Sequence, residues 1–448
     1  MATSRKRRRL KPAVLLGSAL ILYILSIQFA YQYFMLLKWG EDYLETNWGH
    51  GQITPSTGFF VSVLLAYGVF LVSRMGNRPS DFMHLLFFLT PIIPMCIISG
   101  NRGVGLSFIL YVMVAFTMSY FVSCISFKRL FGRMRVGLIG EKQYLRLSVL
   151  MGVGILLWAI AKGGLDHLNF SFSDSYEFRR GASESRGSLL NYVLLNYVGI
   201  LISLGFAIAF SRRKIIYIVS LFAINVAIFA LTSNKAYLFI GVFALAMHII
   251  LSTRSPKFYL TLGLGSVAVG LTVLYLFFPE RWLVPTLFVR RYLFVPAYIN
   301  FFFWDFFSNH SYAYWSDSKF GLGIVESVYG RPTPQVIGDY FSGIDFSNTA
   351  QKFNNANTGW LGSGYGNAGV VGMFIYAIMS GVVTKFANIL GKLVGNKVAI
   401  VGLAFYFFAI FFTSTDLPAA LLTYGFFSLC IILFLWKQTN QRSKNPSA

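Results

Sequence analysis

The sequence predicts an all-α polytopic membrane protein with about twelve transmembrane helices and two long loops on one side of the membrane. Of its 448 residues, 56% are hydrophobic and 12% are charged, whereas a soluble domain is about 45–50% apolar and about 25% charged. Apolar stretches of the length that spans a bilayer, about 20 residues, recur along the chain. The charged residues also divide unevenly between alternate loops, as in multi-pass proteins. This composition excludes a soluble enzyme, a disordered chain and a disulfide-rich secreted domain.

Twelve apolar segments are expected to cross the membrane, so that residues 1–448 form a single integral membrane domain. They lie near 13–37, 57–75, 81–99, 105–126, 147–163, 188–210, 215–231, 236–251, 258–278, 368–390, 398–415 and 419–436. The first segment is interpreted as an anchor helix and not as a cleaved signal peptide. Its apolar core is long, and no small-x-small cleavage site follows it.

The net charge of +22 is compatible with a nucleic-acid binder or with basic cytoplasmic loops. A count of the charged residues in each loop favours basic cytoplasmic loops. The N-terminus, alternate loops and the C-terminal tail carry 25 basic and two acidic residues, and the opposite side carries 13 basic and 14 acidic residues. The sequence therefore predicts cytoplasmic N- and C-termini, association with membrane lipid and no nucleic-acid partner.

Two loops on the predicted outer side are long, at 164–187 and 279–367, and loops of that length usually carry function. Both contain arginines, although outer loops are normally poor in them. The first has Arg179, Arg180 and Arg186, and the second has Arg290, Arg291 and Arg331, with Arg281 at its start. Guanidinium groups match the oxygens of phosphate, so these residues predict an anion site at the membrane surface. Ordinary ion pairing with the outer acids is the alternative.

The second loop is rich in aromatic, amide and glycine residues. Residues 298–307 are mostly aromatic and predict an interfacial or re-entrant helix. Residues 353–366 combine Asn355, Asn357 and Tyr365 with several glycines, a mixture that suits sugar binding because glycine lets the backbone approach a ligand. A turn-rich connector explains the glycines equally well.

Proton transfer has several candidate groups. His310 titrates in the range of a general base, with Asp317, Asp339, Glu326 and Asp305 as carboxylate alternatives in the same loop. Lys235 lies in a short turn between two apolar segments and is a further candidate anion contact.

Metal and nucleotide motifs are missing from the sequence. It has no His-Glu-x-x-His spacing and no phosphate-binding loop, and its three cysteines lie in apolar runs without a paired spacing. We expect no metal site and no cofactor, so any reaction uses a substrate that is already activated.

At these residues the chain resembles the Wzy family of O-antigen or oligosaccharide repeat-unit polymerases. The resemblance rests on the Arg179-Arg180 pair, Lys235 in its turn, and Arg290-Arg291 opening the second loop. It also rests on Gly330-Arg331, on 353–357 and on 366–372, where the next helix begins. One departure is that some members have Gly eleven positions after Arg, whereas Arg331 is followed by Ser342 at that spacing. We therefore compare the loop arginines with those of the family as a cluster of positive charge and not as a motif of fixed spacing.

The resemblance implies a GT-C-like, metal-independent glycosyltransferase of the bacterial inner membrane, active in lipopolysaccharide biosynthesis. It implies transfer of a growing glycan from undecaprenyl diphosphate to an incoming lipid-linked unit at the periplasmic face, with a Wzz-type chain-length regulator as partner. The expected catalytic residues are His310, Asp317, Arg290 and Arg291. The expected substrate-binding residues are Arg179, Arg180, Arg186, Lys235, Arg331, Asn355, Asn357 and Tyr365.

Two alternatives remain. The first is an O-antigen ligase, which would carry one dominant outer loop with a histidine. Because the second long loop contains His310, this alternative stays open. A flippase of lipid-linked sugars would place ionisable residues along a pathway between helices, whereas the apolar segments here are nearly free of charge.

Overall fold

The computed structural model describes residues 12–39, 54–125, 137–168, 187–318, 321, 324–343 and 355–437. Every regular element within these ranges is helical. The N-terminal third contains α1 (Pro12–Ala30), η1 (Tyr31–Leu36), α3 (Pro55–Ser73), α4 (Pro79–Phe87), η2 (Phe88–Ile92), α5 (Ile93–Arg102) and α6 (Leu106–Cys124). The middle third contains α7 (Glu141–Ala161), η3 (Gly164–His167), η4 (Tyr197–Leu201), α9 (Ile202–Ser211), α10 (Ile215–Thr232), α11 (Lys235–Ile250) and α12 (Pro256–Phe277).

The last third contains the long loop of the sequence prediction and the C-terminal helices. Its elements are η5 (Pro279–Arg281), α13 (Leu283–Pro285), η6 (Thr286–Phe294), α14 (Val295–Asn309), α15 (Thr333–Tyr340), α16 (Trp360–Val394), α17 (Asn396–Phe405), η7 (Tyr406–Phe411), α18 (Leu417–Thr423) and α19 (Phe426–Leu435). Residues 279–367, predicted from the sequence as a long loop with interfacial helices, are thus largely helical where they are described.

Nine helices in the described ranges are long and apolar enough to cross a membrane, and each overlaps a predicted segment. The other three predicted segments are shorter or bent. Residues 236–251 and 398–415 coincide with the shorter apolar helices Lys235–Ile250 and Asn396–Phe411. Residues 419–436 coincide with α18 and α19, which meet at a 45° bend. The polytopic helical class is confirmed, and twelve crossings stay a prediction.

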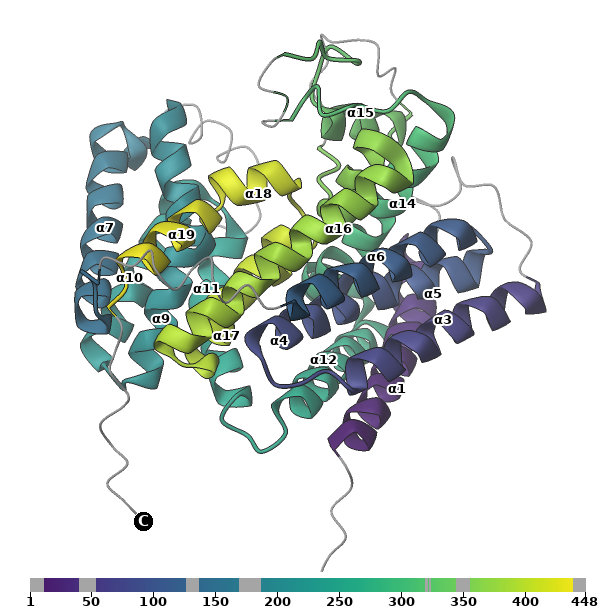
Figure 1. The fold of residues 1–448 in the computed structure, drawn as a ribbon, viewed down its shortest axis with the longest axis horizontal. Helices are drawn as coiled ribbons and strands as arrows, with labels where there is room; N and C mark the ends of the chain where they lie inside the picture. Colours follow the sequence, from purple (N-terminus) through teal and green to yellow (C-terminus); the bar gives the residue numbers. More distant parts are fainter. Residues whose placement is uncertain are drawn as a thin grey trace, which may run out of the picture.

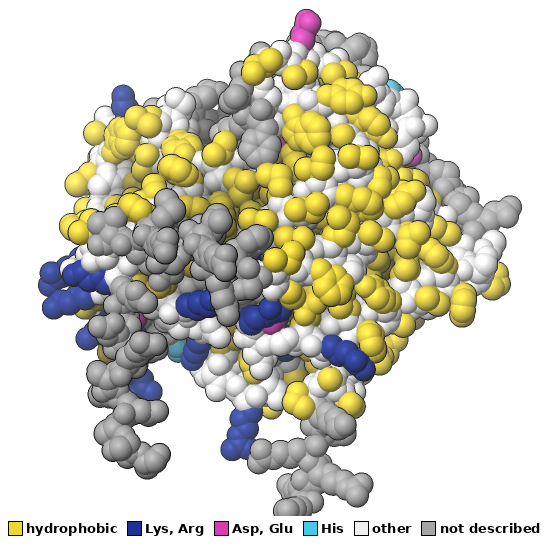
Figure 2. Space-filling model, viewed as in Figure 1, with side chains coloured by type: hydrophobic (Ala, Val, Ile, Leu, Met, Phe, Trp, Pro, Cys, Tyr) yellow, Lys and Arg dark blue, Asp and Glu magenta, His cyan; other side chains and the backbone are white. Residues whose placement is uncertain are grey.

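α16 runs diagonally through the molecule between two groups of helices (Figure 1). One group contains α7, α9, α10 and α11, and the other contains α3, α4, α5 and α6. α16 packs on α6 and α14, while α17 packs on α9 and α11. Hydrophobic side chains cover most of the face in Figure 2, and lysines and arginines gather toward its lower edge. An apolar surface of this extent is that of a membrane-embedded bundle.

The span Pro79–Arg102 forms the centre of the bundle and is buried from Pro79 to Ser99. Pro79 occupies the first turn, where its missing N–H leaves no helical bond unmade. Asp81 accepts a hydrogen bond from the backbone nitrogen of Arg78 at 2.9 Å and so caps the helix. Pro91 lies inside the π-helical turn η2, which accommodates the missing backbone donor. Gly103, with φ of 69°, ends the helix.

The aromatic stretch 298–307 is helical, as the sequence predicted, but it does not lie along the surface. Most of its side chains are buried, including Phe301, Phe303 and Phe307. It continues α13 and η6 and packs on α16, α5 and α15. The aromatic run therefore fills the interior of the bundle because neighbouring helices cover it on several sides.

Candidate functional site

Residues 324–343 fold over the C-terminal half of α14. The ring of Phe341 stacks on Phe302 with centroids 4.1 Å apart. The ring of Tyr340 meets Phe306 edge-on at 5.1 Å. The backbone nitrogen of Ala356 donates to the carbonyl of Pro334 at 2.8 Å, which ties the segment before α16 to α15. These contacts bring together predicted site residues that are far apart in the sequence.

A buried ion pair lies within this cover. Nη1 of Arg331 is 2.6 Å from Oδ2 of Asp339, and the two side chains are 7% and 1% exposed. Nε and Nη2 of Arg331 are also buried, and neither finds a hydrogen-bond partner among the described residues. Leaving a buried donor unpaired costs about 1–3 kcal/mol. Both carboxylate oxygens of Asp339 are likewise buried without a hydrogen-bond partner among the described residues. Open donors and acceptors at one position indicate that a water, an anion or a sugar oxygen would occupy it.

His310 ends α14 and contacts Tyr340, the residue that follows Asp339. Its ring stacks on Phe306 with centroids 4.1 Å apart and meets Tyr340 edge-on at 5.5 Å. Its Nδ1 lies 2.9 Å from the carbonyl oxygen of Phe306. A carbonyl only accepts, so Nδ1 carries the proton, and a neutral ring then has its basic lone pair on Nε2. This tautomer suits a general base, and the catalytic role of His310 stays a prediction.

The carboxylates of the loop differ in their surroundings. Asp317 accepts hydrogen bonds from Oγ of Ser327 at 2.6 Å and from the nitrogen and Oγ1 of Thr333 at 2.9 and 2.6 Å. It thereby anchors the N-terminus of α15, where helical N–H groups lack partners. Glu326 is exposed. Burial raises the pKa of Asp305, and the nearby His310 opposes that rise. Asp317 therefore has a clear structural role, and its predicted catalytic role is untested.

The glycine-rich stretch serves helix packing. A Cβ on Gly362 would lie 2.9 Å from Oδ1 of Asn300, and one on Gly366 would lie 2.8 Å from the ring of Phe307. These glycines let α16 approach α14 closely, so neither the turn-rich connector nor backbone approach to a ligand is needed to explain them. Tyr365 is buried, and its hydroxyl lies 3.1 Å from Oγ of Ser308. Asn355 and Asn357 are exposed just before α16.

α16 breaks at Ala368 and Gly369, whose backbone angles are not helical. The break frees the carbonyls of the preceding turn, and the loop after α14 uses them. The nitrogen of Ala313 donates to the carbonyl of Gly366 at 2.9 Å, and that of Tyr314 donates to the carbonyl of Asn367 at 3.0 Å. Tyr314 and Trp315 have φ of 48° and 60°, a strained conformation that often marks functional segments.

The other predicted cations lie in separate places. Arg179, Arg180 and Arg186 fall outside the described residues. Lys235 begins α11 and is half-buried. The guanidinium of Arg290 lies 4.1 Å from the ring centroid of Trp39, and Arg291 is exposed. Arg290 and Arg331 thus have different neighbours, and a clamp formed by arginines of both loops stays a prediction.

Sequence reasoning missed Asp416, which precedes α18. Its carboxylate caps that helix by accepting from the nitrogen of Leu417 at 2.8 Å. Burial raises the pKa of Asp416 to about 6, and hydrogen bonds from Ser363, Leu417 and Tyr376 oppose the rise. Nε1 of Trp315 donates to the hydroxyl of Tyr376 at 3.0 Å, which links Asp416 to the loop after α14. As the one acid between the last two predicted spans, it could have been singled out from the sequence.

Asp416→Asn is expected to make the protein more stable at pH 7 than the wild type, by a few degrees in the unfolding midpoint. A carboxyl whose pKa rises on folding, here from 3.8 to about 6, holds its proton more tightly in the folded state. The free energy of unfolding of the wild type therefore falls as pH rises through that interval, because the buried carboxyl ionises. The variant has no carboxyl at this position, so it does not lose this free energy. Thermal unfolding of both proteins in detergent at pH 4.5 and pH 7 measures the difference. Glu326→Gln, at an exposed side chain, is the control, and equal pH dependence in wild type and Asp416→Asn would contradict the assignment.

Comparison with known proteins finds no match to a family model, to a curated protein or to a solved structure. The geometry of the described residues therefore provides the structural basis for a functional assignment, alongside the sequence resemblance. Among these residues, no group of three or more His, Cys, Asp or Glu side chains is placed to hold a metal ion.

Proposed function

We propose that the chain polymerises lipid-linked oligosaccharide units by transferring a growing glycan from undecaprenyl diphosphate to an incoming undecaprenyl-diphosphate-linked unit. The observation that carries the proposal is Arg331, whose guanidinium is buried, fixed by Asp339 at 2.6 Å and left with two unpaired donors. A rigid fork of donors in a site shielded from water suits phosphate or sugar oxygens. The likeness of the loop arginines to the Wzy family supports the same reaction.

In the proposed reaction, a hydroxyl oxygen of the acceptor sugar attacks the anomeric carbon of the donor glycan. The bond between that carbon and the diphosphate oxygen breaks, and undecaprenyl diphosphate leaves with the electron pair. Nε2 of His310 takes the hydroxyl proton, because Nδ1 is held by Phe306 at 2.9 Å. The donors of Arg331 offset charge on the departing diphosphate. The reaction needs no oxidant, nucleotide or metal, because the diphosphate is its own leaving group.

The buried ionisable side chains elsewhere do not favour a flippase. Asp81 is buried and pairs with Arg78 at 2.8 Å. The ring nitrogens of His84 lie 2.8 Å from the Ser80 carbonyl and 3.2 Å from Oγ of Ser119. The ammonium of Lys257 donates to the carbonyl oxygens of Met75 and Gly76. These groups are hydrogen-bonded to the protein near helix starts, so they stabilise helix packing and do not mark a transport path.

Purified protein in detergent, supplied with a defined lipid-linked repeat unit, tests the proposal. A polymerase yields a ladder of longer glycans on the lipid, resolved by gel electrophoresis. Because detergent leaves no membrane sides, a flippase leaves the substrate unchanged, and this outcome would contradict the proposal. Adding lipid A core as a second acceptor identifies a ligase, whose product carries the glycan on lipid A.

A further inference from the structure

Two consecutive residues of the loop after α14 have left-handed backbone. Tyr314 and Trp315 have φ of 48° and 60°, in a region that bulky side chains rarely adopt. Only four non-glycine residues in the described ranges have positive φ, and these two are adjacent. Strain of this kind persists where the surrounding contacts impose it, and it concentrates at ligand-binding sites. The contacts of this loop and the side chain that it exposes therefore indicate what the strain serves.

Hydrogen bonds to α16 impose the left-handed backbone. The nitrogens of Ala313 and Tyr314 donate to carbonyls in the turn before the break of α16. The backbone nitrogen of Trp315 donates to Oδ1 of Asn367, in the same turn, at 2.8 Å. Its indole nitrogen donates to the hydroxyl of Tyr376, beyond the break, at 3.0 Å. Four hydrogen bonds to one helix thus fix the loop and offset the cost of its strained conformation.

Tyr312 completes the attachment of the loop. A Cβ on Gly369, at the break, would lie 2.7 Å from the hydroxyl of Tyr312, so this side chain uses the space that the glycine leaves. The ring of Tyr312 meets that of Tyr365 edge-on with centroids 6.2 Å apart, and it meets that of Tyr314 edge-on at 6.1 Å. Tyr365 is 6% exposed and Tyr314 is 53% exposed. The three tyrosines therefore form a row from the interior to the surface.

The attachment leaves the ring of Tyr314 exposed on a rigid base. Tyrosines that anchor a protein at a membrane surface can stand on ordinary backbone, so membrane anchoring does not account for the strain. The same segment exposes hydrogen-bonding side chains at Ser308, Asn309 and Ser311. It also contains His310, the candidate base, four residues before Tyr314. The exposed ring thus belongs to a polar segment that it shares with the candidate base.

The loop is also bound to the segment that carries Arg331. The hydroxyl of Tyr329 donates to the carbonyl of Ser311. The nitrogen of Thr333 donates to the carboxylate of Asp317 at 2.9 Å. The ring of residue 314 lies between these two attachments in the chain, so its position is fixed relative to the candidate site.

We infer that Tyr314 is a stacking platform for one sugar ring of the lipid-linked glycan. The inference rests on the proposed function for the presence of a glycan at this face. The C–H groups on one face of a sugar ring carry slight positive charge, and they pack on the electron-rich face of an aromatic ring. The hydroxyl groups of the sugar then point outward to polar partners, which the same segment exposes. A platform that is fixed before binding loses little conformational entropy when the sugar arrives.

Equilibrium binding of two probes to the purified full-length protein in detergent tests the platform. One probe is undecaprenyl diphosphate carrying a defined oligosaccharide, and the other is undecaprenyl diphosphate without sugar. Tyr314→Gly removes the ring, and glycine suits positive φ better than tyrosine does, so the loop keeps its shape. The affinity of this variant for the glycosylated probe should fall about tenfold, the size of one aromatic contact. Its affinity for the sugar-free probe should stay unchanged.

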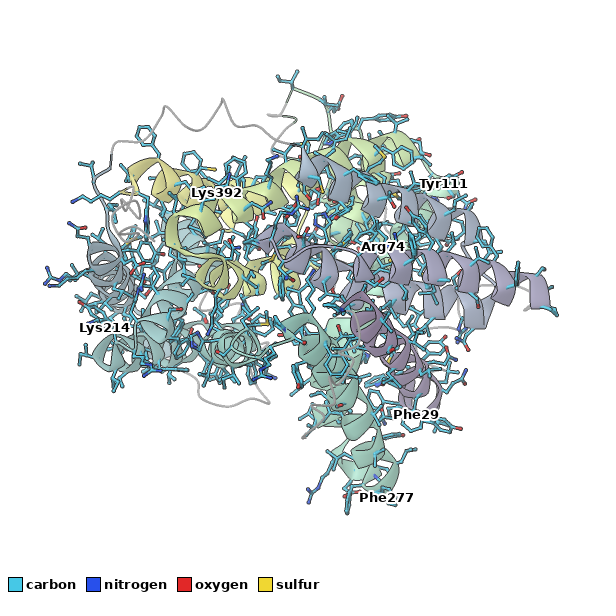
Figure 3. All side chains as sticks on the ribbon, turned by 60° about the horizontal axis from the view of Figure 1, so that its bottom comes forward. Phe29, Arg74, Tyr111, Lys214, Phe277 and Lys392 are labelled. Carbon is cyan, nitrogen blue, oxygen red and sulfur yellow. The ribbon has the colours of Figure 1, made fainter. Side chains whose placement is uncertain are left out.

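Three further variants complete the comparison. Tyr314→Phe keeps the ring and should bind both probes as the wild type does. Tyr314→Asn should repeat the loss seen with glycine, because asparagine also tolerates the left-handed region. Arg213→Gly is the matched control for relief of strain, because Arg213 is exposed and has φ of 52°. It should change neither affinity. Figure 3 shows the next residue, Lys214, far across the molecule from Tyr111 of α6, and α6 packs on α16.

Three results would overturn the inference. The first is a wild type that binds the two probes equally. The second is a Tyr314→Gly variant that binds the glycosylated probe as tightly as the wild type, which would leave the ring without a ligand. The third is an equal loss of affinity for both probes, which would place the ring against lipid, as in an aromatic belt.

Binding requires no acceptor and no turnover, so it is independent of the proposed reaction. If Tyr314→Gly selectively weakens binding of the glycosylated probe but the wild type makes no longer glycan, the platform stands and the polymerase proposal fails. If the wild type elongates glycans but Tyr314→Gly binds both probes normally, the polymerase proposal stands and the platform fails.

Discussion

Replacing Arg331 by alanine is expected to reduce glycan elongation by about 100–1,000-fold, the usual effect of removing one group that stabilises charge in a transition state. The guanidinium is buried, with two donors that the described residues leave unpaired. Arg331→Lys keeps the charge but lacks the planar fork, so it should restore only part of the activity. Elongation of a defined lipid-linked unit by purified protein provides the measurement.

The alanine variant also leaves Asp339 buried without its partner, which costs about 3–5 kcal/mol of folding free energy. A second variant separates stability from activity. Arg331→Met combined with Asp339→Asn removes both charges, so its unfolding midpoint should return toward that of the wild type. Its elongation should remain as low as that of Arg331→Ala. Normal elongation by the double variant would show that the ion pair only holds α15 in place.

Replacing Gly372 by alanine is expected to destabilise the protein by roughly 1–3 kcal/mol or to prevent its accumulation. A Cβ at this position would lie 2.2 Å from the carbonyl oxygen of Gly364. Both atoms belong to α16 on opposite sides of its break, so the clash cannot be relieved by turning a flexible side chain. The break is expected to open, and the contacts of Gly366 and Asn367 with the loop after α14 should be lost.

Gly263→Ala in α12 is the matched control for this substitution. Its Cβ meets no atom within 4 Å, and alanine is favoured over glycine in a helix by about 0.5–1 kcal/mol. Thermal unfolding of the two variants in the same detergent gives the comparison. A midpoint for Gly372→Ala equal to that of the wild type would show that α16 tolerates a side chain at its break.

The apolar segments of the sequence predicted most of the membrane helices because hydropathy alone decides which segments can span a bilayer. Two features could not be predicted from hydropathy. The start of α16 at Trp360 lies in a stretch rich in glycine and asparagine, which are weak helix formers. Close packing of this part of α16 on Asn300 and Phe307 overrides the low helix propensity of its glycine and asparagine residues. The aromatic run of α14 predicted a helix correctly, but its pattern does not distinguish lipid contact from contact with protein.

The candidate site was only partly predictable for a related reason. Residue types indicated that Arg331, His310 and Asp317 belong to one polar loop, and the structure places them around α14 and α15. The ion pair of Arg331 with Asp339 and the cap formed by Asp317 depend on how the loop folds, which composition does not determine. Asp416 was missed because it lies in a short connection between two predicted spans, and its burial depends on how the chain folds.

The stoichiometry of lipid release tests the central claim most directly. Purified wild-type protein is incubated with a lipid-linked repeat unit labelled separately in its lipid and in its sugar. Free undecaprenyl diphosphate and new glycosidic bonds are counted by mass spectrometry. The proposed reaction predicts one free undecaprenyl diphosphate for each bond formed, and the loss of both products in the Arg331→Met, Asp339→Asn variant. Longer glycans without released diphosphate, or released diphosphate without longer glycans, would contradict it.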